Sequence, residues 1–207
     1  MTHVHEFGHA FRDGKSCRGV LFPAGHTEGT LVTDRERPKY RGLRTFRDPH
    51  GRFVFRYPLG WYEHELSDDR DGIMFSPEAD SPQTWFAVWA TRLQDRIVAD
   101  DLPVLREGVD EGLYQLPELR LQSSSERLLG NLIRFERIYT FRENGATRRR
   151  KVWFLYVYKW AFVLIAQGAT PEAYEHWSIM LEGCIDEFNL APTLWFASDP
   201  DMADKLE

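Results

Sequence analysis

Cysteine is scarce in this 207-residue chain, which contains only Cys17 and Cys184. Two cysteines cannot build the disulfide framework that is typical of small secreted domains. The first residues also lack a basic segment followed by an apolar one, which is the pattern of a secretory signal peptide. We therefore expect a cytoplasmic protein that folds without disulfide bonds.

Long hydrophobic runs are absent as well. The two longest, Val152–Tyr158 and Trp160–Ala166, are separated by Lys159. Neither reaches the roughly 20 consecutive apolar residues that cross a bilayer. We expect no membrane span.

Positive charge is not in excess, because 26 lysines and arginines stand against 32 acidic residues, for a net charge of −6. This balance disfavours nucleic acid as a partner of the whole chain. The sequence also lacks a glycine-rich phosphate loop and any Ser/His/Asp or Cys/His set that could be argued as catalytic. These absences predict a protein that is not an enzyme.

Aromatic residues, in contrast, make up 14% of the chain, enough for a dense core with some left for recognition. Apolar residues alternate with polar ones in Arg52–Tyr57, which predicts a half-buried strand. Further strands are predicted at 73–75, 85–89, 133–141, 152–158 and 160–166, with Asn144-Gly145 as a hairpin turn. Apolar residues recur at helical spacing after Asp101 and again after Thr170-Pro171-Glu172, and these residues can cap a helix. Two helices are therefore predicted. The pattern indicates an α+β protein with a meander-rich antiparallel sheet.

Three segments can be distinguished along the chain. Residues 1–45 form an N-terminal extension, or arm, that carries four of the seven histidines and keeps no regular period. Alone, such a segment buries too little apolar surface to offset the entropy of ordering it. Residues 46–188 form the domain, and residues 189–207 form a C-terminal tail.

Two motifs in the domain resemble those of one known family. The segment Phe53-Val54-Phe55-Arg56-Tyr57-Pro58-Leu59-Gly60-Trp61 resembles the F-x-Y-P-x-G-W opening of PsbP-like domains. The Thr170-Pro171-Glu172-Ala173-Tyr174 helix start, after Ala166-Gln167-Gly168, is also similar to that family. The resemblance covers about residues 46–188. It implies an α/β/α sandwich around a central, mostly antiparallel sheet of about six strands, and a role in binding other proteins without a family catalytic residue.

The arm contains His5-Glu6-Phe7-Gly8-His9, which matches the H-E-x-x-H signature of zinc proteases. In such enzymes the two histidines bind zinc from one helix face while the glutamate activates water. Here Gly8 interrupts a very short helix, and no strand precedes it to shape a substrate cleft. A zinc-dependent hydrolase that uses His5, Glu6 and His9 is therefore kept as an alternative, with zinc as its only cofactor.

A second motif is a group of cations on the predicted hairpin. Strand alternation divides Arg148 and Arg150 from Arg149 and Lys151, placing the two pairs on opposite faces. The group is either a docking site for an acidic partner, a phosphate or nucleic acid, or a solvated hairpin end paired with Glu136 and Glu143. Its seven members are Arg134, Arg137, Arg142, Arg148, Arg149, Arg150 and Lys151.

Two aromatic pairs also need a role. Trp85 and Trp89 share one strand face and belong either to the core or to an aromatic groove for an apolar ligand or client segment. Trp195 and Phe196 follow the last predicted helix, where exposed apolar side chains would be a liability. The tail therefore either folds back onto the domain or inserts into a neighbour.

These observations together predict a non-enzymatic protein-binding or adaptor domain within a larger assembly. Its partner would be another protein subunit or a second copy of the chain. The arm, the tail and the cationic hairpin are the expected contact regions. The alternatives are the zinc hydrolase and the aromatic-groove binder.

Overall fold

The structure of the chain is a computed structural model that describes residue 38 and residues 41–66 and 70–203. Its centre is a seven-stranded sheet in the order β3-β4-β5-β9-β8-β7-β6, in which every neighbouring pair is antiparallel. The strands are β3 (Tyr62–Glu65), β4 (Gly72–Ser76), β5 (Trp85–Arg92), β6 (Arg120–Leu129), β7 (Leu132–Glu143), β8 (Ala146–Val157) and β9 (Trp160–Gly168).

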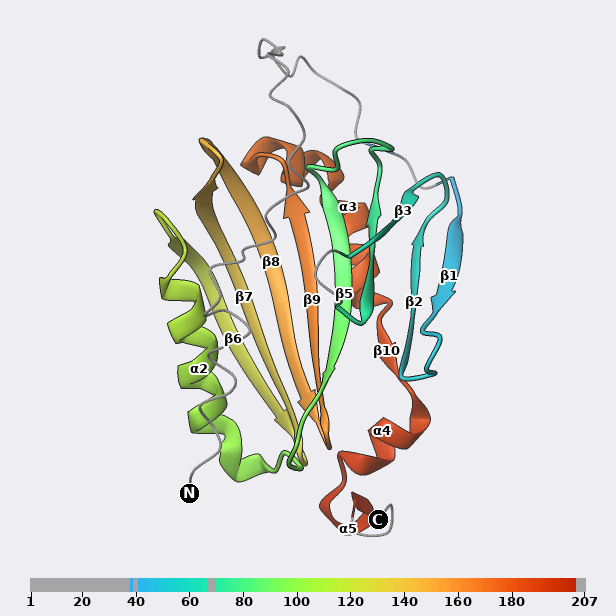
Figure 1. Cartoon of the computed structure of the whole chain (residues 1–207), viewed down its shortest axis with the longest axis vertical. Coiled ribbons are helices and arrows are strands. Elements are labelled where there is room, and N and C mark those ends of the chain that lie inside the picture. Colours follow the sequence, from blue (N-terminus) through green and yellow to red (C-terminus); the bar gives the residue numbers. More distant parts are fainter. Residues whose placement is uncertain (1–37, 39–40, 67–69, 204–207) are drawn as a thin grey trace.

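A second, three-stranded sheet has the order β1-β2-β10, and the helices cover the central sheet from both sides (Figure 1). Helix α2 packs on one face, which we call the α2 face. Helix α3 and the small sheet pack on the other, the α3 face. The remaining elements are β1 (Leu43–Arg47), β2 (Phe53–Pro58), β10 (Asn189–Leu190), the 3-10 turn η2 (Ala99–Asp101), α2 (Leu102–Tyr114), α3 (Pro171–Asp186), α4 (Pro192–Ala197) and α5 (Pro200–Ala203).

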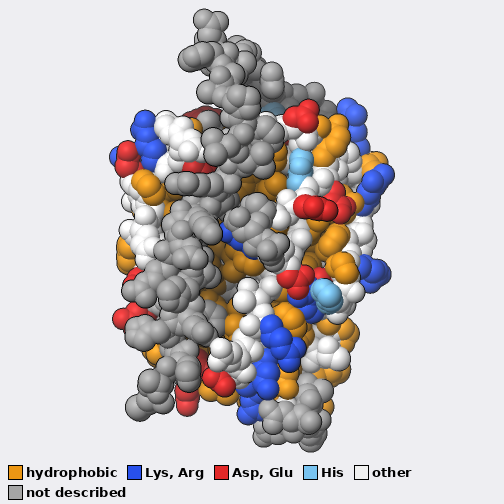
Figure 2. Space-filling model, in the orientation of Figure 1, with side chains coloured by type: hydrophobic (Ala, Val, Ile, Leu, Met, Phe, Trp, Pro, Cys, Tyr) orange, Lys and Arg blue, Asp and Glu red, His pale blue; other side chains and the backbone are white. Residues whose placement is uncertain are grey.

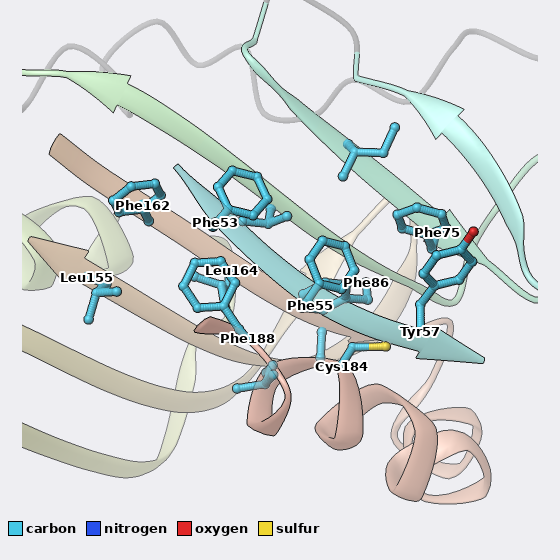
Figure 3. Close-up of a cluster of buried hydrophobic side chains, with 14 of the residues drawn as sticks. Phe53, Phe55, Tyr57, Phe75, Phe86, Leu155, Phe162, Leu164, Cys184 and Phe188 are labelled. Atoms are coloured by element: carbon cyan, nitrogen blue, oxygen red, sulfur yellow. The ribbon is translucent and has the colours of Figure 1, made fainter. Parts of the chain in front are cut away.

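The larger core lies between the α3 face, α3 and the small sheet (Figure 3). Aromatic rings dominate it: the Phe55 ring meets Phe86 edge-on at 5.1 Å and Phe75 at 5.7 Å between centroids. These separations fall in the range where edge-to-face aromatic pairs are favourable. The aromatic residues of the predicted Arg52–Tyr57 strand therefore point into this core.

The layered α+β arrangement is as predicted, but the central sheet has seven strands instead of about six. Residues Ser123–Ser125 lie in β6, a strand that the sequence pattern did not predict. All ten residues of β6 are exposed, so the strand shows no apolar alternation, and its extended form depends on the ladder to β7. The small sheet begins at Leu43 and takes in Asn189–Leu190, so it draws on residues beyond 46–188 at both ends.

The local signals at the turn and at α3 are confirmed. Asn144 and Gly145 both have positive φ, 51° and 80°, as a type I′ hairpin turn requires. Thr170 caps α3, because its side-chain oxygen accepts a hydrogen bond from the Ala173 backbone nitrogen at 3.1 Å. None of the helices in the described part of the chain is long and apolar enough to cross a membrane.

A buried ion-pair network joins the small sheet to the central sheet. The Arg52 guanidinium donates to both carboxylate oxygens of Asp48 at 2.7 Å and to Asp71 Oδ1 at 2.8 Å. Hydrogen bonds from Arg52 hold the pKa of Asp71 below its usual value of 3.8, with the Arg52 charge adding to the effect. The network thus fixes a half-exposed carboxylate in its charged form.

This network predicts a small acid-sensitive contribution to stability. Because the folded pKa of Asp71 is lowered, its contribution is complete above about pH 4 and is lost as the pH falls through the folded pKa. Urea unfolding between about pH 5 and about pH 2 should therefore show a shallower loss of stability for Asp71→Asn than for the wild type. An equally steep loss in both proteins would contradict the assignment.

Candidate functional site

The seven cations predicted on the β7–β8 hairpin divide between the two faces of the sheet, because alternate residues of a strand point to opposite sides. The α2 face receives Arg137, Arg148 and Arg150, and all three are buried. The α3 face receives Arg134, Arg142, Arg149 and Lys151. The predicted separation of Arg148 and Arg150 from Arg149 and Lys151 is therefore found.

The three arginines on the α2 face are structural, which corrects their interpretation as members of a surface patch. Arg137 is 1% exposed, and its Nη2 donates to Asp110 Oδ1 of α2 at 3.0 Å. Arg150 lies over the Phe141 ring at 4.4 Å, and its Nε donates to Gln167 Oε1 at 2.5 Å. Arg148 donates to the Ala169 carbonyl at 2.7 Å. Their hydrogen bonds offset the cost of burying charge.

The two tryptophans of β5 also belong to this α2 face. Trp85 is buried beneath Arg150, at 5.5 Å from its guanidinium carbon. Trp89 is half-buried, with the Arg70 guanidinium carbon 5.1 Å from its ring centroid. The burial of Trp85 is contrary to its proposed place in an open aromatic groove, and both rings pack in the second core.

The α3 face carries the remaining cations beside helix α3. We define the cationic surface as Arg127, Arg134, Arg149, Lys151 and Trp153, which lie on three neighbouring strands. Arg127 of β6 and Arg134 of β7 stand directly opposite each other in the ladder. The Arg134 guanidinium carbon lies 4.1 Å from the centroid of the Trp153 ring. The ring is held in turn by a 2.5 Å hydrogen bond from Trp153 Nε1 to Glu136 Oε2.

Two cations of this surface already have carboxylate partners. Lys151 Nζ lies 3.2 Å from Glu182 Oε2 of α3 and 3.7 Å from Glu136 Oε2. Arg149 forms an ion pair with Glu175 of α3. Arg142, farther along the same face, lies 3.8 Å from Glu118 Oε1. Of these contacts, only that between Lys151 and Glu136 is the cross-strand pairing predicted as the alternative to docking; Glu143 pairs with Arg148 and Arg150 on the α2 face.

The opposed pair Arg127 and Arg134 differs from these cations. Within the described residues, no salt bridge joins either side chain to a carboxylate. Burial lowers the pKa of the Arg134 guanidinium, and the neighbouring charge of Arg127 lowers it further, while the charges of Glu136 and Asp186 act in the opposite direction. Like charges that face each other across two strands destabilise the sheet, and a bound anion would relieve this repulsion.

Arg127 is not among the seven cations predicted from the sequence, although the sequence contains a signal for its position. Gly130 and Asn131 form the turn between Leu129 and Leu132, so counting back through the ladder places Arg127 opposite Arg134. This reasoning works only if β6 is recognised as a strand, and its serines leave it without the apolar alternation by which a strand is recognised. The position therefore follows from pairing and not from the pattern of β6 itself.

The C-terminal tail folds back onto the domain, which was one of the two predicted alternatives. The Asn131 backbone nitrogen donates to the Ser198 carbonyl at 2.6 Å, and Leu194 is buried. Trp195 and Phe196 nevertheless remain 43% and 58% exposed. The tail is thus fixed against the β6–β7 hairpin turn, and its two aromatic side chains are left at the surface.

Metal ligands and cavities are the other features of the described residues that bear on function. They contain no cluster of three or more histidine, cysteine or acidic side chains placed to hold a metal ion. A cavity of about 150 Å³ near Phe46 and Gly72 is lined by Asp48 and Asp71, both held by Arg52. The predicted zinc ligands His5, Glu6 and His9 lie outside the described residues.

Figure 2 shows the α2 side, where acidic and basic side chains of the described residues are interspersed.

Two solved structures share this arrangement of layers. The cyanobacterial PsbP protein (CyanoP) of Synechocystis sp. PCC 6803 superimposes with a TM-score of 0.52 at 12% identity, over 82% of this chain and 99% of its own. LpqN of Mycobacterium tuberculosis, described as involved in cell envelope biogenesis, gives 0.51 at 16% identity, over 73% and 91%. The chain therefore has a PsbP-like fold, as its motifs predicted. No family model matches the chain, and no curated protein matches its sequence.

Proposed function

We propose that this chain is a non-enzymatic docking module whose cationic surface binds an acidic segment of another protein. The observation that supports the proposal is the opposed pair Arg127 and Arg134, which no salt bridge joins to a carboxylate within the described residues. Trp153 adds an apolar ring beneath Arg134. A protein segment could place carboxylates between the two arginines.

The charges around the pair favour a short acidic segment over a nucleic acid. Glu136, Glu175 and Glu182 lie among the cations, and they would repel a continuous phosphate backbone. The net charge of −6 acts in the same direction. A segment with few, spaced carboxylates would bring less negative charge near these glutamates than a continuous phosphate backbone.

The chemistry of the surface supports binding over catalysis. Its titratable groups are arginines and a lysine, which carry positive charge at neutral pH. Cys184 of α3 is buried, and burial raises the pKa of its thiol, so it stays protonated and unreactive. Such groups hold opposite charge in place; they do not transfer protons.

A fluorescein-labelled hexaglutamate peptide tests the proposal by fluorescence anisotropy. Arg127→Glu combined with Arg134→Glu should weaken binding about tenfold or more relative to the wild type, because two favourable charge contacts become repulsive. Arg134→Gln alone should weaken it less and guards against misfolding of the double variant. Binding by the wild type should also weaken steeply with added salt.

The matched control is Arg44→Glu combined with Arg47→Glu, which makes the same charge change on exposed positions of β1. This variant should lose little affinity. Equal losses in the two double variants would show a general effect of net charge and would contradict a site at the cationic surface.

A further inference from the structure

Strand β6 forms one edge of the central sheet and pairs only with β7 among the described strands. We propose that β6 binds its partner by strand addition, and that the added strand alternates acidic and apolar side chains. The inference rests on the proposed docking function and names the form of the ligand. The acidic side chains would lie on the α3 face, and the apolar ones on the α2 face.

Among the described strands, none pairs with the outer edge of β6. All ten residues of β6 are exposed, and the strand contains neither proline nor lysine, two residues that commonly block pairing at sheet edges. A bulge between Leu121 and Ser123 breaks the regular ladder. Residues 123–129 then remain as a regular stretch long enough to pair with one short strand.

The two faces of this stretch differ in chemistry. On the α3 face, Arg127 lies beside Arg134, so a residue paired with Arg127 would bring a carboxylate within reach of both. On the α2 face, Glu126 is already held by Arg106, whose Nε donates to it at 2.7 Å. Leu128, next on that face, is 48% exposed. Leu129, on the α3 face next to Arg127, is 61% exposed as well. The added strand therefore needs a carboxylate opposite Arg127 on the α3 face and an apolar side chain opposite Leu128 on the α2 face.

A second copy of the chain fits this edge less well. In a symmetric antiparallel pair, residues that face each other must lie on the same face of the sheet. Glu126 and Arg127 lie on opposite faces, so the glutamate of one copy cannot face the arginine of the other. A pair centred on Ser125 would set Arg127 against Ser123 and leave the arginines without a carboxylate. Charge complementarity thus favours an acidic partner strand.

The experiment compares two peptides of identical composition on the full-length protein. The alternating peptide is acetyl-Glu-Val-Glu-Ile-Glu-Val-Glu-amide, and its block isomer places the four glutamates before the three apolar residues. The alternating peptide should bind at least about tenfold more tightly. It should also slow backbone hydrogen–deuterium exchange across residues 120–129.

Two substitutions on the edge should weaken binding of the alternating peptide. Leu128→Lys and Arg127→Glu should each lower its affinity at least about fivefold. Leu43→Lys, at an exposed leucine of β1, is the control and should change it little. Slower exchange at β6 that is lost in Leu128→Lys would locate the peptide on the edge.

Three results would overturn strand addition. If both isomers bind equally, depend on Arg127 and leave β6 exchange unchanged, the cationic surface binds acidic peptides without pairing, and only the proposed docking function stands. If neither isomer nor hexaglutamate binds, the docking function itself fails. If β6 is protected without peptide, a second copy or another segment of this chain occupies the edge, and dependence on protein concentration distinguishes the two.

Discussion

Replacing Arg52 by alanine is expected to lower the free energy of unfolding by about 3–5 kcal/mol, the usual effect of breaking a buried ion pair. The Arg52 side chain is 6% exposed and that of Asp48 is 3% exposed. Without Arg52, the Asp48 carboxylate would stay buried without its cation. The guanidinium also stacks on the Trp160 ring at 5.0 Å, and that packing would be lost too. Urea unfolding at neutral pH measures the change.

An exposed ion pair between β2 of the small sheet and the end of α3 provides the control. Arg56 Nη2 lies 2.7 Å from Glu187 Oε2, with both side chains well exposed. Arg56→Ala should therefore cost no more than about 1 kcal/mol. Similar losses for Arg52→Ala and Arg56→Ala would show that the buried network does not hold β2 to the central sheet.

Replacing Gly168 by alanine is expected to cost about 3 kcal/mol or more, at the upper end of the range for overpacking. A Cβ atom at this position would lie 2.4 Å from the Tyr174 nitrogen and 2.6 Å from its Cα. These are backbone atoms of the first turn of α3, so relief would require the helix to move away from β9. Helix α3 supplies much of the α3-face core, including Tyr174, Leu181 and Ile185.

The matched substitution is Gly108→Ala in the middle of α2. Nothing lies within 4 Å of a Cβ atom there, so alanine adds no clash. It should stabilise the protein by about 0.5–1 kcal/mol, because glycine lowers helix propensity. Thermal or urea unfolding should thus give opposite signs for the two glycines, and a loss at both would contradict this packing of α2.

The elements that could be predicted from sequence are those whose signals are local. The Asn144-Gly145 turn follows from residues that tolerate positive φ, and α3 begins where Thr170 and Pro171 supply a cap and a first turn. Strand β2 shows its buried face as alternating aromatic residues. Strand β6 could not be found in this way, because its extended form depends on pairing with β7.

The candidate site was only partly predictable for the same reason. Alternation correctly separated the cations of β8 into two sets, but it did not show which set is buried. That depends on Asp110 of α2 and Gln167 of β9, which are distant in sequence from Arg137 and Arg150. Arg127 was missed because its importance arises only when β6 places it opposite Arg134.

The proposed function depends on the cationic surface being the docking site for an acidic segment. The most direct test is a two-dimensional NMR titration of isotopically labelled full-length protein with the hexaglutamate peptide. The account predicts that backbone shift changes cluster in β6, β7 and β8 around Arg127, Arg134 and Trp153, and that Arg127→Glu with Arg134→Glu removes them. Shift changes centred on the small sheet, on α2 or on the tail would contradict it.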